Sequence, residues 1–320
     1  MLKRVRAFAP ATCANVSSGF DVFGFALTGV GDEVELWISD PPSGRPAVRL
    51  DLVEGDGGAL PRDGLRNTAV VAVRALLDAC VGRAGQAPSL EMRLKKGLPR
   101  GSGMGSSAAS AAAGVIAANR LLGDPFADEE LVRFAMEGER AACGAAHADN
   151  VAPAVLGGFV LVRSYSPLDL VRVGVPEDLW ATIVHPDLVL STAKSRAALP
   201  IEYPRSVLVD QMGNAAALAV ALLRGDYGLI GRALRDSVAE PYRAPLIPGF
   251  GEAKDAALEA GALGAGISGS GPSTFALARG EAGARKAAEA MIAAFSRRGI
   301  ASQSWTAAVA AGGPRILLEE

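Results

Sequence analysis

Pro99-Arg-Gly-Ser-Gly-Met-Gly-Ser-Ser-Ala-Ala109 is the stretch from which the rest of this sequence is best interpreted. It follows Leu90 to Lys95, where apolar and polar residues alternate as in a strand, and it opens an alanine-rich helix predicted from Ser106 to Leu122. Glycines let a backbone approach a phosphate closely, and the serines leave free N–H groups at the positive end of the helix dipole. The pattern therefore predicts an anion site, in preference to a turn that only caps a helix.

Two better-known nucleotide motifs are disfavoured by their context. The stretch lacks the lysine that follows the glycines in GxxxxGK[ST], so it is not a Walker A loop. A second cluster, Gly264-Ala-Gly-Ile-Ser-Gly269, matches GxGxxG, but a predicted helix precedes it and the predicted strand Thr274 to Leu277 follows it. A nicotinamide-dependent dehydrogenase is therefore a poor interpretation. A glycine loop that closes over a substrate or shapes the floor of a cleft fits better.

Length and composition indicate a globular protein of two domains. The chain has 320 residues, 50% hydrophobic and 21% charged, and its net charge of -2 gives no electrostatic signature of a nucleic-acid or membrane partner. Three widely spaced cysteines without a CxxC pair exclude a disulfide framework and a cysteine zinc site. The apolar run Ala108 to Ala118 is eleven residues long, too short to cross a bilayer. A cytoplasmic protein is expected.

Strands and helices are mixed along the chain without strict alternation, which favours an α+β fold. The boundary is expected near residues 160–175, so residues 1–165 form an N-terminal domain with the glycine loop and residues 166–320 a C-terminal domain. Further strands are predicted at Val5–Ala9, Phe20–Leu27, Glu33–Ser39, Gly157–Arg163 and Trp180–His185. Further helices are predicted at Asn67–Val81, Asp128–Cys143, Asp210–Arg224, Gly228–Ser237, Gly251–Ala260 and Ala282–Phe295.

Glu139 stands out in the predicted helix Asp128–Cys143. At 100° per residue it falls in the middle of the apolar arc, whereas the other charged residues of the helix from Glu129 onward fall outside that arc. A carboxylate on an inward face is unfavourable unless a cation meets it. An internal salt bridge, for example to Arg163, would satisfy it. A phosphate loop without its own lysine favours Mg²⁺ as the cation, held by carboxylate and hydroxyl oxygens.

Three motifs in order resemble those of the GHMP small-molecule kinases, in the form typical of members that act on homoserine. They are Ala9 to Gly24, Pro99 to Ala109 and Gly264 to Ser273. Two departures from the family pattern are Met104 in place of leucine and Ser17-Ser18 in place of Gly-Pro. The resemblance implies a two-domain GHMP kinase fold: an N-terminal domain with a left-handed βαβ unit, a C-terminal ferredoxin-like domain, and a site in the cleft between them.

The resemblance also implies a nucleotide site and a metal site. ATP would bind on the phosphate loop, which comprises Pro99, Arg100, Gly101, Ser102, Gly103, Met104, Gly105, Ser106, Ser107, Ala108 and Ala109. Glu139 and one of the two serines, with Ser107 preferred, would hold Mg²⁺. Glu139, Ser106 and Ser107 would then carry catalysis by direct in-line transfer of the γ-phosphoryl group, and no general base is named because a loose transition state needs little help from one.

For the acceptor, the resemblance implies L-homoserine and its phosphorylation to O-phospho-L-homoserine in threonine biosynthesis. Arg196 and Arg243 would bind the substrate carboxylate, since planar guanidinium groups suit it. Asp21 would bind the ammonium from within an apolar strand. The remaining polar contacts would come from Asn15, His147, Asn150, Thr192 and Gly269.

Three alternatives stay open at this point. The acceptor could be mevalonate, shikimate or a sugar, although neutral sugars need neither arginine. The chain could also be a binding or regulatory module that has kept the fold and lost catalysis. A homodimer is implied by family analogy only.

Overall fold

The computed structural model describes residues 2–39, 47–58, 60–61, 64–144, 147–310 and 312–320. Its larger sheet has the order β11-β1-β2-β4-β3, with β5 pairing to β2 and β6 to β5. The strand β2 is seventeen residues long and pairs with β1, β4 and β5 along its length. The seven strands are β1 (Arg4–Ala14), β2 (Phe23–Ser39), β3 (Val48–Glu54), β4 (Ser89–Lys95), β5 (Phe159–Tyr165), β6 (Leu168–Val173) and β11 (Arg315–Glu319).

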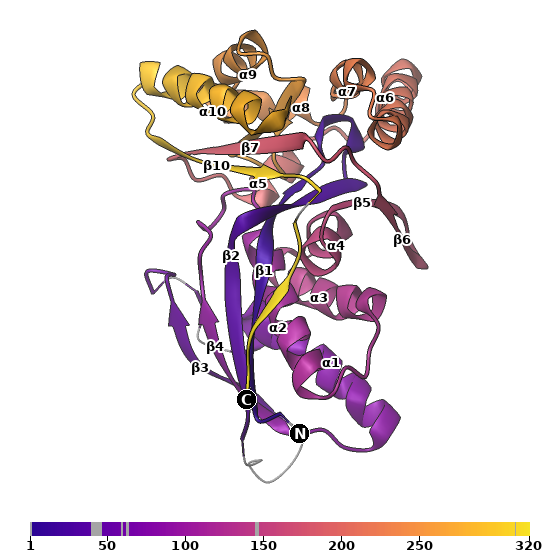
Figure 1. Ribbon diagram of the computed structural model, residues 1–320, viewed down its shortest axis with the longest axis vertical. Helices are drawn as coiled ribbons and strands as arrows, with labels where there is room; N and C mark the ends of the chain where they lie inside the picture. The colour runs from indigo at the N-terminus through magenta and orange to yellow at the C-terminus, as the bar shows by residue number, and fades with distance from the viewer. Residues whose placement is uncertain (1, 40–46, 59, 62–63, 145–146, 311) are drawn as a thin grey trace.

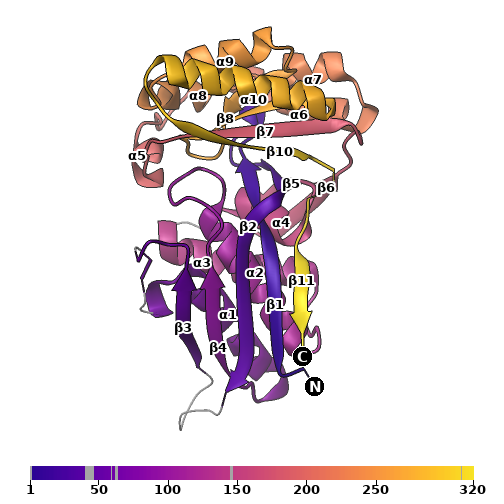
Figure 2. The ribbon, with the colours of Figure 1, turned by 60° about the vertical axis from the view of Figure 1, so that its left-hand side comes forward.

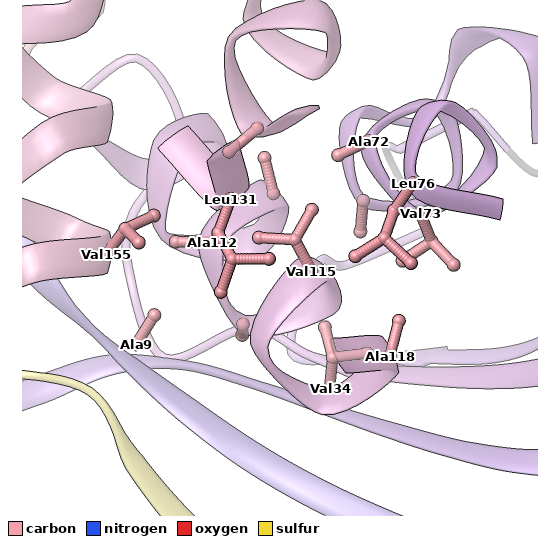
Figure 3. Close-up of a cluster of buried hydrophobic side chains, with 14 of the residues drawn as sticks. Ala9, Val34, Ala72, Val73, Leu76, Ala112, Val115, Ala118, Leu131 and Val155 are labelled. Atoms are coloured by element: carbon pink, nitrogen blue, oxygen red, sulfur yellow. The ribbon is translucent and has the colours of Figure 1, made fainter. Parts of the chain in front are cut away.

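Four helices cover one face of this sheet: α1 (Thr68–Ala84), α2 (Ser106–Leu121), α3 (Asp128–Cys143) and α4 (Ala148–Leu156) (Figure 1). The central helix α2 is built largely from alanine, so α1 and α3 approach it closely. Gly114 of α2 faces the backbone of Ala69, and Gly138 of α3 faces the backbone of Thr68. Figure 3 shows how side chains from all four helices meet the strand residues Ala9 and Val34 in one buried cluster.

The smaller sheet has the order β10-β7-β9-β8 and every neighbouring pair is antiparallel. In chain order this is a strand order of 4-1-3-2 with helical crossovers, which is the ferredoxin-like arrangement. Helices α9 and α10 pack on it (Figure 2). Its strands are β7 (Leu179–Pro186), β8 (Gly264–Ile267), β9 (Thr274–Arg279) and β10 (Ser302–Ala308). Its helices are α5 (Thr192–Ala197), α6 (Arg205–Arg224), α7 (Tyr227–Ala233), α8 (Glu240–Arg243), α9 (Phe250–Glu259) and α10 (Gly280–Arg297).

The α+β class and the two-domain architecture are confirmed, whereas several expected elements differ. The stretch 20–27 is not one strand, because a 3₁₀ turn at Ser17–Gly19 comes first and β2 starts only at Phe23. The second glycine cluster is not a loop throughout, because Gly264–Ile267 forms β8 and the turn begins at Ser268. The short helix α4 was not expected, since Pro153 lies inside it.

Strands from beyond residue 165 join the first sheet. The strand β6 pairs with β5, and the C-terminal strand β11 returns to pair antiparallel with β1, so both chain termini lie at the same end of the molecule (Figure 2). The expected division at residues 165/166 is therefore not a division between the sheets. Such a return could not be predicted, because the strand pairing joins residues about 310 positions apart, Val5 with Glu319.

The helix α6 is the one helix among the described residues that is long and apolar enough to cross a membrane by length and composition. Its Leu218 and Leu222 are buried in the apolar core shared by the two sheets, and the side chain of Gln211 donates a hydrogen bond to Ser18 O. These contacts hold one side of α6 against the rest of the protein, whereas most of the helix surface is exposed.

Candidate active site

A cavity of about 480 Å³ lies where the two domains meet. Residues from the first motif, the phosphate loop, α3, the start of α4, the start of α5 and the third motif line it. The structure brings together here most of the residues predicted from sequence: Asn15, Asp21, Arg100, Gly101, Ser102, Gly103, Gly105, Ser106, Ser107, Glu139, His147, Asn150, Thr192, Arg196, Arg243 and Gly269.

Four residues of the predicted phosphate loop do not line the cavity. The side chains of Met104, Ala108 and Ala109 are buried in apolar cores, and Pro99 is likewise absent from the cavity wall. Met104 packs in the core between the two sheets, and its carbonyl oxygen accepts a hydrogen bond from Thr12 N at 3.0 Å. These residues support the loop on the side away from the cavity. The burial of Met104 agrees with a change of packing from leucine to methionine at this position.

The phosphate loop has a backbone that only glycine adopts easily. Gly101, Gly103 and Gly105 have φ angles of 62°, 76° and 65°, in the left-handed region. A Cβ on Gly103 would lie 2.5 Å from Ser268 O. The loop ends in α2, whose first turn has no side-chain cap. Its free N–H groups therefore face the cavity end of a sixteen-residue helix, where they and the helix dipole favour an anion.

The third motif holds the phosphate loop in place. Ser268 Oγ donates a hydrogen bond to Gly103 O at 2.7 Å, and Ser273 N donates to Ser102 O at 3.2 Å. The motif therefore shapes the floor of the cavity, one of the two roles that its glycines suggested.

A buried lysine stands beneath the start of α2. Lys96 Nζ forms an ion pair with Asp32 and donates to Ser106 O and Ser110 Oγ, both at 2.8 Å. Asp32 is also bonded by Ser110 Oγ and by Gly97 N. The glycine loop itself contains no lysine, as the sequence indicated, but Lys96, three residues before the loop, lies beside the start of α2. The signal was present, since strand alternation turns Lys95 to solvent and Lys96 inward.

Glu139 is buried as predicted, with 5% of its surface exposed. Within the part of the chain that the structure describes, its Oε1 atom has no hydrogen-bond partner. Burial raises the pKa of this carboxyl group above its usual value, while a hydrogen bond from Ser107 and the charge of Lys96 act in the opposite direction. The alternative salt bridge to Arg163 is wrong, because Arg163 pairs with Asp169 at the surface.

The cavity is also lined by a salt bridge between two predicted substrate residues. Arg196 Nη1 and Nη2 donate to both carboxylate oxygens of Asp21 at 3.0 to 3.3 Å. Asp21 does not lie within a strand as expected but in a turn, with a left-handed φ of 58°. His147 Nδ1 lies 3.5 Å from Arg196 Nη2, and burial, together with the arginine charge, lowers the pKa of this histidine.

Arg243 is almost fully buried, with 3% exposure, and it contacts carbonyl groups in place of a carboxylate. Its Nη1 donates to Gly269 O at 2.9 Å, and its Nε donates to Ser195 O at 3.4 Å. Gly269 O also accepts from Asn15 Nδ2 at 2.6 Å. Desolvation lowers the pKa of the Arg243 guanidinium. Nearby, Thr192 Oγ1 lies 3.3 Å from Ser270 Oγ, and Asn150 Oδ1 accepts from Thr12 Oγ1 at 2.8 Å.

Several cavity residues were missed from sequence. Asp149 is buried and lines the cavity between His147 and Asn150, and Ser110, Asn67 and Ser270 line it as well. For Asp149 the only sequence signal was its position beside the predicted substrate residue Asn150, because the helix that begins at Ala148 was not expected. Ser110 and Asn67 carried no such signal.

Comparison with known proteins gives the family. Residues 67–158 match the model for the GHMP kinases N terminal domain, and residues 218–297 match that for GHMP kinases C terminal. Homoserine kinase from Chlorobaculum tepidum is 51% identical, over 99% of each chain. The chain belongs to the homoserine kinase family of GHMP kinases. Homoserine kinase from Xanthomonas campestris pv. campestris is 43% identical, over 99% of this chain and 95% of that protein.

Solved structures support the assignment to the homoserine kinase family. The crystal structure of homoserine kinase from Cytophaga hutchinsonii superimposes with a TM-score of 0.94 at 48% identity, over 99% of this chain and 98% of that chain. Mevalonate kinase from L. major has a TM-score of 0.67 at 17% identity, over 95% and 96%, and shares the fold alone. Among the acceptors left open by sequence, the comparisons therefore favour homoserine, and the chain is a phosphotransferase by family.

Replacement of Lys96 tests the buried charge network. Lys96→Met leaves Asp32 buried without its cation and is expected to lower the free energy of unfolding by about 3–5 kcal/mol. The matched control is Lys95→Met, because Lys95 makes a solvent-exposed pair with Glu33 and is expected to contribute under about 1 kcal/mol. Urea unfolding measures both variants, and equal losses would contradict a buried role for Lys96.

Proposed function

We propose that this homoserine kinase transfers the γ-phosphoryl group of ATP to the side-chain hydroxyl of L-homoserine, and so forms O-phospho-L-homoserine for threonine biosynthesis. One observation carries the proposal: a single cavity is lined both by the glycine loop at an uncapped helix N-terminus and by two arginines, Arg196 and Arg243. The first feature suits polyphosphate and the second a small carboxylate. We place the reaction in the cytoplasm, where the buried thiols Cys13 and Cys80 stay reduced.

For the nucleotide, the residues Gly101 to Ser107 supply backbone N–H groups in a conformation that the third motif holds in advance. Such preorganised donors stabilise charge that develops on a transferring phosphoryl group without reorganising during the reaction. Lys96 adds positive potential below the first turn of α2, because its ammonium group is bonded to Ser106 O. This half of the cavity therefore positions ATP and stabilises its charge.

Glu139 and Ser107 fit a Mg²⁺ ion. Both offer hard oxygen atoms, and Glu139 Oε1 is buried without a hydrogen-bond partner. The described residues include no cluster of three or more His, Cys, Asp and Glu side chains suited to a metal. One carboxylate with substrate phosphates is the usual way in which proteins hold this ion. When bound, Mg²⁺ would neutralise the negative charge of the phosphates; the residues of the chain supply the rest of the geometry.

Positioning is the main contribution of the acceptor half. With the carboxylate of homoserine held by the arginines, its side chain would extend toward the phosphate loop and present the hydroxyl for in-line attack. Phosphoryl transfer passes through a loose transition state, so alignment and electrostatic stabilisation account for most of the acceleration. Asn150, held by Thr12, is the amide that would orient the hydroxyl.

The function is tested by the release of ADP from ATP and Mg²⁺ with different acceptors. Turnover is expected with L-homoserine, and only background ATP hydrolysis is expected with mevalonate, shikimate, galactose or no acceptor. If another acceptor is phosphorylated, the assignment of the phosphate site would stand and the acceptor roles of Arg196 and Arg243 would be wrong. If folded protein that binds ATP releases no ADP with any acceptor, the chain would be a regulatory module.

Glu139→Gln tests the metal role. Turnover is expected to fall by roughly 10³-fold, because several kcal/mol of charge stabilisation depend on the metal, while the fold is retained since the carboxylate has an unpartnered oxygen. The matched control is Glu137→Gln on the same helix, whose side chain is exposed beside Arg140 and whose replacement should leave kcat unchanged. Near-normal kcat for Glu139→Gln at saturating Mg²⁺ would remove Glu139 from the site.

Arg243→Ala tests the carboxylate role. We expect the KM for L-homoserine to rise by about 100-fold and the KM for ATP to change little, because a buried charge-assisted contact to one substrate is lost. Arg243→Lys should recover only part of the affinity, since an ammonium cannot donate in the planar, two-pronged way of a guanidinium. Steady-state kinetics with each substrate varied measures both, and equal effects on the two KM values would place Arg243 outside the acceptor pocket.

A further inference from the structure

Two buried polar atoms behind the cavity lie close to each other, and neither is satisfied by the protein. Ser17 is 3% exposed, and within the part of the chain that the structure describes neither its Oγ atom nor Glu240 Oε2 has a hydrogen-bond partner. Both atoms lie beside Gly266, because a Cβ on this glycine would be 2.5 Å from Ser17 Oγ and 3.4 Å from Glu240 Oε2. A hydroxyl group and a carboxylate are complementary donor and acceptor, and burying both without partners is unfavourable.

The backbone of Ser17 makes its side chain more notable. Its φ angle is 55°, in the left-handed region, and Asn15 and Val16 before it have φ angles of 72° and 44°. The family pattern has glycine at position 17, and glycine adopts this conformation without strain. Strained residues persist where the surrounding structure gains from them. Since serine adds only a hydroxymethyl group to glycine, the gain at this position belongs to the hydroxyl.

The Glu240 carboxylate is incompletely stabilised by its protein contacts. One of its oxygen atoms, Oε1, pairs with Lys254 of α9, whereas Oε2 receives no donor from the described residues. Burial raises the pKa of the Glu240 carboxyl group, the charge of Asp236 adds to this shift, and Lys254 opposes it. A further hydrogen-bond donor at Oε2 would therefore stabilise the ionised carboxylate.

A single water molecule suits the space between these two side chains. The strand β8, which contains Gly266, is the edge strand of the smaller sheet and contacts the turn Ser17–Gly19. One side of its backbone therefore has no strand partner. A buried water typically makes about three hydrogen bonds to otherwise unsatisfied groups. Here it would accept from Ser17 Oγ, donate to Glu240 Oε2 and meet the free edge of β8. A cation suits the space less well, because Lys254 already supplies a positive charge to this carboxylate.

We propose that Ser17 and Glu240 hold one buried water molecule, which fixes α8 against the first motif, and that both are positioning residues for the acceptor half of the site. This inference rests on the proposed function and extends it to two residues that do not line the cavity. Glu240 begins the four-residue helix α8 and Arg243 ends it. A shift of α8 would therefore move the Arg243 guanidinium away from Gly269 O, to which it donates.

Ser17→Ala removes the hydroxyl and keeps the left-handed backbone. We expect the KM for L-homoserine to rise by about five- to tenfold, and the KM for ATP and kcat to stay within about twofold, because one bridging contact to the acceptor half is lost. Steady-state kinetics with each substrate varied measures this. Equal changes in the two KM values, or no change in either, would overturn the proposal.

Ser18→Ala is the matched control for Ser17→Ala. Ser18 is 2% exposed, and its Oγ atom also lacks a hydrogen-bond partner among the described residues. The atoms nearest to the Cβ position of Gly266, however, belong to Ser17, Phe275 and Glu240. Ser18→Ala should therefore leave the KM for L-homoserine unchanged. A rise equal to that of Ser17→Ala would show that any buried hydroxyl of this turn has the same effect, which contradicts the proposed water site.

Ser17→Gly separates positioning from stability. Glycine relieves the left-handed strain, so the midpoint of urea unfolding should be at least that of the wild type, while the KM for L-homoserine rises as in Ser17→Ala. If the role of Ser17 were only structural, the midpoint would fall and the KM would not change. Because glycine is the residue of the family pattern here, this variant keeps the proposal testable even if Ser17→Ala does not fold.

Combining Ser17→Ala with Glu240→Gln tests whether the two residues share one water molecule. The double variant should raise the KM for L-homoserine no further than the larger single effect, whereas independent residues would multiply their effects. A crystal structure gives the direct test. One water within about 3 Å of both Ser17 Oγ and Glu240 Oε2 is expected in the wild type, and none in Ser17→Ala. A direct hydrogen bond between the side chains, or a metal ion between them, would refute the proposal.

Failure of the proposed function would give a different result from failure of this inference. It would appear as an absence of ADP release from the wild-type enzyme with L-homoserine. If instead the wild type turns over L-homoserine and Ser17→Gly has an unchanged KM for it, the proposed function stands and the positioning role of Ser17 is wrong.

Discussion

The hydrogen bond from Ser268 Oγ to Gly103 O joins the two domains at the point where the phosphates of ATP are expected to lie. Gly103 has no room for a Cβ, because the backbone of Ser268 and Gly271 packs against it. On the other side, Thr12 N donates to Met104 O, and Gly269 N donates to Ala14 O. The three motifs are thus held by one another, although 239 residues (25–263) separate the end of the first from the start of the last. Neither domain alone can form the cavity.

This constraint explains the distribution of charge around the loop. A backbone held in left-handed conformations presents N–H groups to the cavity, and these groups are the first source of positive potential. Lys96 is the second, and it is retained in the interior because Asp32 and Ser110 satisfy it. Glu139 has the opposite character: its carboxylate is buried near this positive potential with one oxygen unpartnered. This buried oxygen does not stabilise the folded state, and it is free to bind a ligand.

Much of this could be predicted from sequence, and the failures have physical causes. The helix Asp128–Cys143 and the inward position of Glu139 followed from the 3.6-residue period, which depends only on near neighbours. The strand β11 did not, since its partner β1 lies at the other end of the chain. Asp21 was placed in a strand because its neighbours are apolar, whereas the residues with left-handed φ in this turn, Asn15 to Ser17 and Asp21, are not glycines. The ion pair between Asp21 and Arg196 could not be predicted from sequence, because the two residues are 175 positions apart and meet only in the folded structure.

The pairing of charges also explains why the two halves of the cavity suit different chemical groups. The proposed nucleotide half is lined by backbone groups of the glycine loop, and the overall fold that carries this loop is shared with mevalonate kinase from L. major at 17% identity. The acceptor half relies on individual side chains, and there the Asp21–Arg196 pair is complete while Arg243 and Asp149 are not. A neutral acceptor would leave both of these charges desolvated and uncompensated. These two charges are unfavourable in the free protein, so this half of the cavity is where a ligand that carries charges of both signs would gain most.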